Sequence, residues 1–227
     1  MGYKAVLCDI DGVLVDSYAL VRRCHCIVVK KYLGNAVDAT WLDGLWGKGY
    51  REQLQYLFRV SGQDTRDISW ESVYLSWRRT YARFHHVLAK PMAGAAGLLR
   101  DLDRIGVMVG VVSGRERDRI ALACELLPEM KLAKVIISKD DVVRCKPDPE
   151  GVLLAVRRLR VGARETLFVG DSDSDVISGG AAGVDVFIVG TRISKSVLDA
   201  NSSAIVGAAV STEAWAQSIL GLVSHKS

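Results

Sequence analysis

The amino-acid sequence predicts an α/β protein with a doubly wound, parallel-sheet core and an inserted helical subdomain. Five short apolar runs alternate with segments of helical periodicity, which is typical of parallel strands connected by helices. About ninety residues separate the first run from the second, far more than the dozen or so that a crossover needs. We therefore assign residues 1–15 and 91–227 to the α/β core and residues 16–90 to the helical subdomain.

The elements of the core follow from the spacing of apolar residues. Each of the five runs is apolar almost throughout, as expected for strands buried on both faces of a parallel sheet. Three segments between them carry apolar residues at i, i+3 and i+4, the spacing of amphipathic helices. The predicted strands are residues 4–8, 107–112, 134–137, 166–169 and 184–189, and the predicted helices are residues 94–105, 115–127 and 149–160.

The inserted segment shows helical patterns over residues 18–33, 49–60 and 69–88, with glycine-containing joints between them. Four of the five tryptophans lie in this segment. We expect such bulky side chains to fill the core of a small helical unit. The four are Trp41, Trp46, Trp70 and Trp77.

Composition and charge indicate a soluble, cytoplasmic protein. The net charge of +4, from 30 basic and 26 acidic residues, is too small and too scattered to predict a nucleic-acid partner. Five cysteines without framework-like spacing indicate reduced thiols. The N-terminus lacks the apolar stretch of a secretory signal. No apolar run approaches the ~20 residues that a membrane helix needs, so no membrane association is expected.

Two aspartates, Asp9 and Asp11, follow the first predicted strand. In an extended segment the side chains at i and i+2 point the same way, and two carboxylates beside a buried strand are unfavourable without a compensating charge. Gly12 allows a sharp turn and the close approach of a ligand. Taken alone, the segment is equally compatible with a simple Asp-Gly turn.

A second acidic segment, Gly170 to Asp175, follows the fourth predicted strand. Ligands of open α/β sheets bind at this end of the strands. If the first and fourth strands are neighbours, Asp171 and Asp175 converge with the first two aspartates. Such a cluster requires a cation, and an all-oxygen donor set favours Mg²⁺. The alternative, an acidic helix N-terminus, accounts for Asp173.

Two further segments supply hydrogen-bond donors and positive charge. Ser113 and Gly114 follow the second strand, where a hydroxyl and backbone amides suit an anion, although serine is also a common N-cap. Lys146 lies in a loop stiffened by two prolines and is suited to act as a fixed charge, although a surface lysine in a proline turn is the simpler interpretation.

Together these segments resemble the haloacid dehalogenase superfamily over essentially the whole chain. The resemblance rests on the run Asp9 to Leu14, on Ser113, on Lys146 and on the run Gly170 to Asp175, in that order. The insert resembles the helical cap of the phosphoglycolate phosphatase and β-phosphoglucomutase branch. The resemblance implies a Rossmann-like core and a Mg²⁺-dependent phosphatase that acts on a small phosphorylated metabolite through a phospho-aspartyl intermediate.

The resemblance also implies residue roles. Asp9 is expected to attack phosphorus, and Asp11 to protonate the leaving oxygen and then activate water. The groups expected to bind phosphoryl oxygens are Ser113, Lys146 and the amides of Gly12 and Gly114. The groups expected to hold Mg²⁺ are Asp9, the carbonyl of Asp11 and Asp171, with Asp175 in support.

Two alternatives stay open at this stage. One is a phosphoglucomutase-like phosphotransferase, since Arg51 lies where such mutases carry a cap arginine, although the histidine that they carry early in the cap falls at Val21. The other is a non-catalytic phosphate-binding protein. Asp11 argues against dehalogenation and phosphonate cleavage, because those branches lack this acid.

The sequence also leads to expectations for individual polar residues and for the oligomeric state. Lys48, Tyr50 and Arg51 are expected to face the substrate from the cap, although Lys48 and Arg51 are equally compatible with solvated charges at a helix start. His25 is expected on a helix surface. Arg115 is expected to face solvent at the start of a helix, with a substrate contact as the alternative. Both a monomer and a homodimer are compatible with the sequence.

Overall fold

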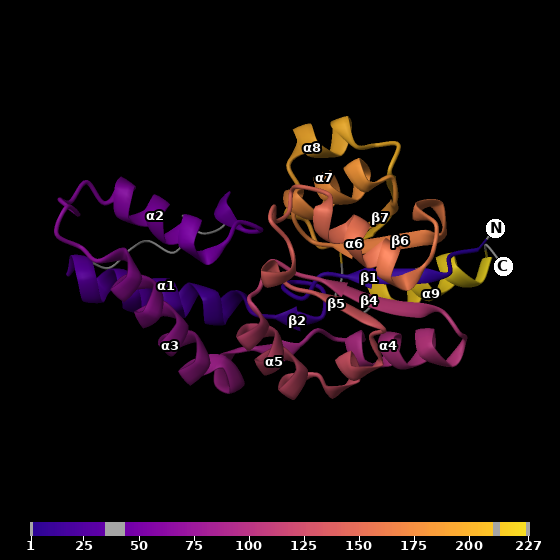
Figure 1. Cartoon of the computed structure of the whole chain (residues 1–227), viewed down its shortest axis with the longest axis horizontal. Helices are drawn as coiled ribbons and strands as arrows, with labels where there is room; N and C mark the ends of the chain where they lie inside the picture. The colour runs from indigo at the N-terminus through magenta and orange to yellow at the C-terminus, as the bar shows by residue number, and fades with distance from the viewer. Residues whose placement is uncertain (1, 35–43, 211–213, 226–227) are drawn as a thin grey trace. The chain divides into compact units, whose positions relative to one another are not determined.

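The computed structural model describes residues 2–34, 44–210 and 214–225, so Trp41 lies outside the described residues. The chain divides into two compact units (Figure 1). The α/β unit comprises Met1–Asp16 and Pro91–Ser227, and the helical unit comprises Ser17–Lys90. Two short strands, β2 (Val15–Asp16) and β3 (Lys90–Pro91), pair where the chain passes from one unit to the other and back.

The α/β unit contains a parallel sheet in the order β5-β4-β1-β6-β7-β8, which confirms the predicted fold class. The last strand, β8, was not predicted, because the run Ile-Val-Gly-Ala-Ala contains glycine and alanine, which have weak strand preferences. The strands are β1 (Ala5–Cys8), β4 (Met108–Val112), β5 (Val135–Ile137), β6 (Thr166–Gly170), β7 (Asp185–Val189) and β8 (Ile205–Ala209).

Helices cover both faces of the sheet, as the doubly wound arrangement requires. α4, α5 and α9 lie on one face, and α6, α7 and α8 lie on the other (Figure 1). The two inner strands β1 and β6 are consequently buried along their whole length. The helices are α4 (Ala95–Arg104), α5 (Arg117–Leu126), α6 (Glu150–Leu159), α7 (Asp173–Ala182), α8 (Lys195–Ala200) and α9 (Trp215–His225).

The start of α5 differs from the sequence expectation in a way that matters for the site. The predicted helix begins at Arg115, whereas α5 begins at Arg117, because Glu116 has extended backbone angles (φ −68°, ψ 157°) and serves as the N-cap. Gly114 and Arg115 therefore belong to the loop that follows β4. This loop lies at the carboxyl end of the sheet.

The helical unit consists of α1 (Tyr18–Leu33), α2 (Tyr50–Val60) and α3 (Trp70–Leu88). Its core is a stack of rings centred on Trp77, which is fully buried. The ring of Tyr50 stacks on Trp77 with centroids 4.2 Å apart, and Tyr81 stacks on it at 5.1 Å. Trp77 therefore fills the core of the unit as predicted from its size. Trp46 and Trp70 are half-buried.

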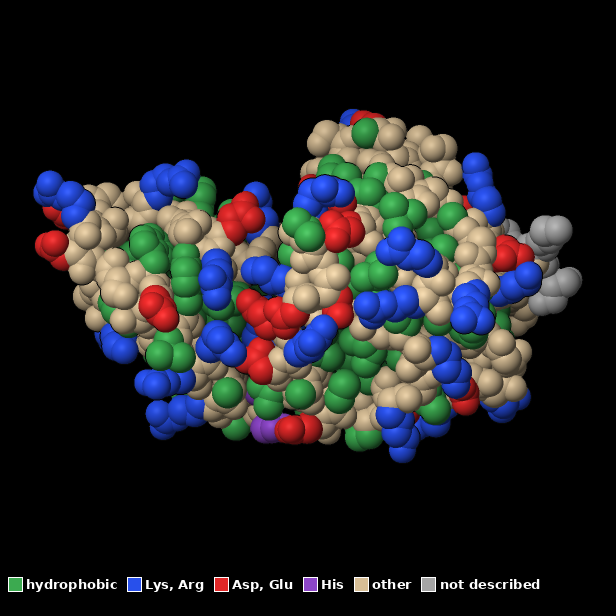
Figure 2. All heavy atoms as spheres, in the orientation of Figure 1, with side chains coloured by type: hydrophobic (Ala, Val, Ile, Leu, Met, Phe, Trp, Pro, Cys, Tyr) green, Lys and Arg blue, Asp and Glu red, His purple; other side chains and the backbone are tan. Residues whose placement is uncertain are grey.

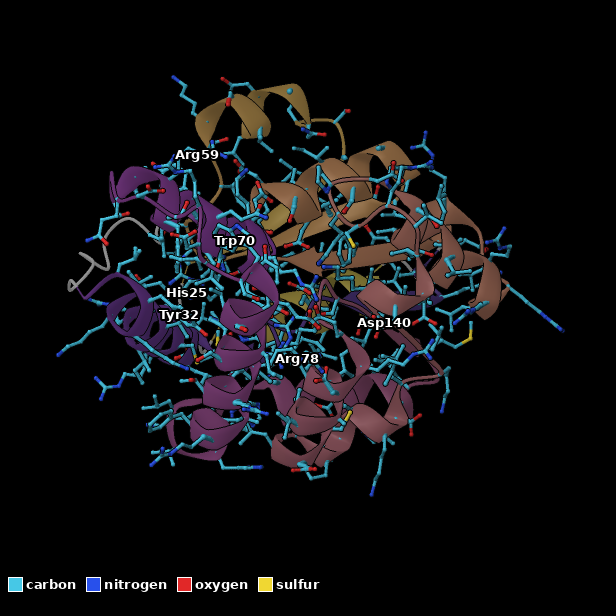
Figure 3. The ribbon with its side chains drawn as sticks, turned by 60° about the vertical axis from the view of Figure 1, so that its left-hand side comes forward. His25, Tyr32, Arg59, Trp70, Arg78 and Asp140 are labelled. Atoms are coloured by element: carbon cyan, nitrogen blue, oxygen red, sulfur yellow. The ribbon has the colours of Figure 1, made fainter. Side chains whose placement is uncertain are left out.

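His25 lies in this core and not on a helix surface, so the sequence expectation was wrong. It lies on α1, as Tyr32 does, with Trp70 and Arg78 on α3 (Figure 3). Its side chain is 1% exposed and packs edge-on against Trp77, whose indole N–H donates to Nδ1 at 3.3 Å. The misassignment arose because α1 buries a broad face that includes Leu20, Cys24 and Val28 as well.

The buried imidazole makes the helical unit sensitive to acid. Burial lowers the pKa of His25 to about 4 from an ordinary value of 6.5. Protonation is thus disfavoured in the folded unit but not in the unfolded chain. His25 should not contribute to the pH dependence of stability above pH 6.5. Because the folded unit resists its protonation, the free energy of unfolding should fall by about 3 kcal/mol as the pH falls from 6.5 to 4.

Tryptophan fluorescence during urea unfolding measures this effect, because four of the five tryptophans belong to the inserted segment. The His25→Met variant removes the titrating group and places an apolar side chain in the core. Its stability should fall less steeply between pH 6.5 and 4 than that of the wild type. Equal slopes for the two proteins would contradict the buried, neutral state of His25.

The face of the molecule seen in Figure 2 is not covered by charges of one sign. Lys and Arg side chains of the α/β unit are interspersed there with acidic and apolar side chains. Among the described residues, no helix combines the length and the apolar character that crossing a bilayer requires.

Candidate functional site

Three neighbouring strands of the sheet end at the same level and bring the predicted segments together. Cys8, the last residue of β1, pairs with Val111 of β4 on one side and with Val169 of β6 on the other. The amide of Asp9 donates to the carbonyl oxygen of Val169 at 3.0 Å. The loops after β1, β4 and β6 therefore emerge side by side at the carboxyl edge of the sheet, where open α/β sheets bind ligands.

Three carboxylates form a buried cluster at this edge. One oxygen from each of Asp9, Asp171 and Asp175 lies within 4.8 Å of the other two. The residues are 7%, 4% and 0% exposed, respectively. The buried oxygen Oδ1 of Asp9 forms an ion pair with the Lys146 ammonium. A buried set of three carboxylates fits a hard divalent cation such as Mg²⁺, because carboxylate oxygens are ligands that this ion prefers.

Lys146 places its charge against the same cluster. Its ammonium nitrogen lies 3.0 Å from Oδ1 of Asp9 and 2.5 Å from Oδ1 of Asp175, and its side chain is only 9% exposed. Burial disfavours the charged amine, but the two carboxylates outweigh burial and raise the pKa of Lys146. The lysine is therefore a fixed, buried positive charge and not a surface residue of a proline turn.

Asp175 is held by hydrogen bonds through both of its oxygens. Oδ1 pairs with Lys146, while Oδ2 accepts from the amides of Asp171 and Ser172 at 3.2 and 3.1 Å and from the Ser172 hydroxyl at 2.6 Å. These contacts fix the loop that carries Asp171. Asp175 thus orients its neighbours, with Oδ2 accepting three hydrogen bonds and Oδ1 facing Lys146.

The electrostatic environment of Asp9 is unusual for an aspartate. Burial raises the pKa of Asp9 to about 7, against the opposing effect of the Lys146 charge and with the support of the Asp175 and Asp11 charges. A divalent cation beside this group would favour its ionised form. The preceding thiol differs, because burial raises the pKa of Cys8 to about 12 and keeps it protonated.

Asp11 is paired with Arg115, which corrects the expected exposure of this arginine. Arg115 is 1% exposed, and its Nε and Nη2 donate to the two carboxylate oxygens of Asp11 at 2.9 and 2.6 Å. The expectation was wrong because the helix starts two residues later than predicted, so Arg115 turns inward from the loop. The sequence Ser-Gly-Arg directly after a buried strand was the available signal.

The remaining predicted residues of the α/β unit adjoin the cluster. Ser113 and Gly114 line one small cavity with Lys146, and the Lys146 ammonium also donates to the carbonyl oxygen of Val112 at 3.2 Å. Gly12 has a positive φ of 74°, and a Cβ added there would overlap the carboxylate of Asp171. The backbone after β1 therefore packs directly against the Asp171 side chain.

The three predicted substrate contacts of the insert belong to the helical unit. Lys48 is exposed and pairs with Glu52 at 2.7 Å. Tyr50 is 4% exposed and forms part of the Trp77 stack. The Arg51 guanidinium lies 4.7 Å from the centre of the Tyr74 ring.

Arg192 is a neighbour of the cluster that sequence reasoning did not identify. It follows β7 and lies 3.7 Å from the Asp171 carboxylate through Nη1. Because β7 is the next strand after β6 in the sheet, its loop opens at the same edge. Only the strand order, which the sequence does not reveal, points to this residue.

Comparison with known proteins agrees with this architecture. A model of the haloacid dehalogenase-like hydrolases matches residues 6–189. An N-acetylmuramic acid 6-phosphate phosphatase of Pseudomonas putida is 30% identical over 187 residues, 81% of each chain. A phosphoglycolate phosphatase of Salmonella choleraesuis is 30% identical over 200 residues, 79% of this chain and 78% of that protein.

Solved structures share the fold. CbbY from Rhodobacter sphaeroides in complex with phosphate superimposes with a TM-score of 0.78 at 20% identity, covering 92% of this chain and 95% of that one. At this identity the likeness concerns the fold alone. The family match spans most of the sequence and includes the loops after β1, β4 and β6. The chain belongs to the haloacid dehalogenase-like hydrolase family.

Proposed function

We propose that this protein is a Mg²⁺-dependent phosphatase that hydrolyses small phosphate monoesters through a phospho-aspartyl intermediate on Asp9. The observation that carries the proposal is the joint placement of a buried nucleophile, a carboxylate cluster and a fixed lysine charge at one edge of the sheet. The names of the two relatives at 30% identity support a small phosphorylated substrate, of the phosphoglycolate or sugar-phosphate type.

The Mg²⁺ ion would be held by Asp9, the carbonyl of Asp11 and Asp171, and when bound it neutralises phosphoryl charge. Both oxygens of Asp175 are already engaged by Lys146 and the loop after β6, which supports an indirect role for this residue. Lys146, Ser113 and the amides of Gly12 and Gly114 bind the phosphoryl oxygens. Phosphoryl transfer depends mainly on such positioning and charge stabilisation.

The chain's own residues carry the proton and the phosphoryl group. A carboxylate oxygen of Asp9 bonds to phosphorus while the bond from phosphorus to the ester oxygen breaks, and Asp11 gives that oxygen a proton. In the second step Asp11 takes a proton from water as the water oxygen bonds to phosphorus. Asp9 leaves as the free carboxylate, so phosphate and alcohol are the products.

The helical unit would supply the contacts to the rest of the substrate. Lys48 and Arg51 are the proposed partners of a second anionic group. Arg51 Nε donates to the hydroxyl of Tyr50 at 3.3 Å, which supports an orienting role for the tyrosine.

A screen of phosphorylated metabolites for phosphate release, with Mg²⁺ and with EDTA, tests the proposal. Release should require Mg²⁺, and the Asp171→Asn variant should need far more of it. Arg192→Gln is the control, because it removes a neighbouring charge but no proposed ligand. Phosphate release that is equal in EDTA would contradict the metal requirement, and a wild type inactive on every ester would favour a binding role.

The Gly12→Ala variant tests the packing of the loop against Asp171. The added methyl group overlaps the Asp171 carboxylate, so this side chain must move, and Mg²⁺ affinity should fall by about 10–100-fold. Gly34→Ala is a matched control, because Gly34 has a similar φ of 71° but open space around the added methyl. Metal titrations in which the two variants behave alike would contradict the proposed ligand role of Asp171.

A further inference from the structure

Arg115 and Asp11 form an ion pair at the site in which the arginine is almost fully buried. The arginine side chain is 1% exposed, whereas the Asp11 side chain is 28% exposed. The guanidinium contacts both carboxylate oxygens through two separate nitrogens, at 2.9 and 2.6 Å. Such a two-point contact fixes the plane of a carboxylate, which a single hydrogen bond does not.

The arginine is itself anchored from two sides. Its Nη1 donates to the carbonyl oxygen of Arg119 in α5 at 3.3 Å, and its backbone amide donates to the hydroxyl of Ser113 at 3.3 Å. The backbone of Arg115 is therefore held within the loop after β4, and its guanidinium is held by the first turn of α5. Asp11 lies on the loop after β1, and Arg115, on the loop after the neighbouring strand β4, holds its carboxylate.

We propose that Arg115 is a positioning residue that sets the orientation of the Asp11 carboxylate for proton transfer. The inference rests on the proposed function, in which Asp11 exchanges a proton with the leaving oxygen and with water. The Asp11 side chain stays 28% exposed although Arg115 contacts both of its oxygens. Arg115 can therefore hold Asp11 without covering it.

Two other roles make different kinetic predictions. An arginine that bound the substrate directly would act independently of Asp11, and its loss would raise KM. An arginine with a purely structural role would lower the amount of folded protein and leave the kcat of the folded fraction unchanged. A positioning role alone makes the effect of Arg115 depend on the presence of the Asp11 carboxylate.

A double-mutant cycle separates these roles. The proteins are the wild type, Arg115→Met, Asp11→Asn and the double variant, assayed with Mg²⁺ on p-nitrophenyl phosphate, whose leaving group departs readily enough to keep the weak variants measurable. In the wild-type background, Arg115→Met should lower kcat by about 10–100-fold, the scale of a displaced catalytic group. In the Asp11→Asn background the same change should lower kcat less than about twofold.

Three controls accompany the cycle. Arg117→Met removes an exposed arginine two residues away, paired with Asp141, and should leave kcat unchanged. Arg115→Lys should recover part of kcat, and added guanidinium ion should partly restore Arg115→Met. Thermal unfolding measured on every variant identifies any that fail to fold.

Equal losses of kcat in both backgrounds, or a loss expressed mainly in KM, would overturn the positioning role while leaving the phosphatase proposal intact. If the wild type releases no phosphate, the proposed function fails separately. Crystal structures of the wild type and of Arg115→Met then decide the inference. A rotated Asp11 carboxylate in the variant supports positioning, and an unchanged carboxylate overturns it.

Discussion

Replacement of Asp9 by asparagine should abolish phosphatase activity, with a loss on the order of 10⁴-fold or more, as for the removal of other covalent nucleophiles. The amide has the shape of the carboxylate but is a far poorer nucleophile towards phosphorus. The fold should survive, because Asp9 is a buried acid and Lys146 keeps its contact with Asp175. Phosphate release and thermal unfolding, measured together, check both expectations.

Asp173→Asn is the matched control for this substitution. Asp173 belongs to the acidic segment after β6, but its carboxylate accepts from the amide of Ser194 and not from the cluster. Its replacement should leave phosphate release unchanged. Activity that persists in Asp9→Asn at more than a few per cent of the wild type would exclude Asp9 as the nucleophile.

Replacement of Lys146 by methionine should reduce both stability and activity. Without the ammonium group, the carboxylates of Asp9 and Asp175 remain buried with no compensating charge from residue 146, which in proteins costs about 3–5 kcal/mol. Loss of one charge that binds the phosphoryl group should also lower kcat by about 10²–10³-fold. Urea unfolding and steady-state kinetics measure the two effects.

The stability loss of Lys146→Met should depend on Mg²⁺. A cation bound between the carboxylates replaces part of the missing charge, so the loss should be largest in EDTA and smaller at saturating Mg²⁺. Lys139→Met is the control, since Lys139 is partly exposed and its ion pair with Glu116 is long, at 3.9 Å. A Lys146→Met protein as stable as the wild type in EDTA would contradict the buried charge arrangement.

The parts of the fold that could be predicted are those in which a local pattern determines the structure. The apolar runs predicted β1, β4, β5, β6 and β7, because strands buried on both faces must be apolar throughout. The three helices of the insert were predicted to within one residue at each end, since their amphipathic spacing is regular. The carboxylate cluster followed from the strand-end rule once β1 and β6 were taken as neighbours.

The parts that could not be predicted depend on tertiary packing. The inward turn of Arg115 depends on where α5 begins, and helix starts are poorly defined by spacing alone. The burial of His25 depends on α3 packing along α1, and the approach of Arg192 to Asp171 depends on the order of strands in the sheet. When contacts with segments distant in the sequence determine the position of a polar residue, no local sequence pattern predicts that position.

The central claim is that Asp9 becomes phosphorylated in a Mg²⁺-dependent reaction, and trapping the acyl phosphate tests it most directly. Borohydride reduction of enzyme quenched during turnover converts a phosphorylated aspartate into homoserine, which peptide mass spectrometry locates. We expect homoserine at position 9 when Mg²⁺ and substrate are both present, and none in EDTA. Turnover without modification at position 9, or with homoserine at another aspartate, would contradict the account.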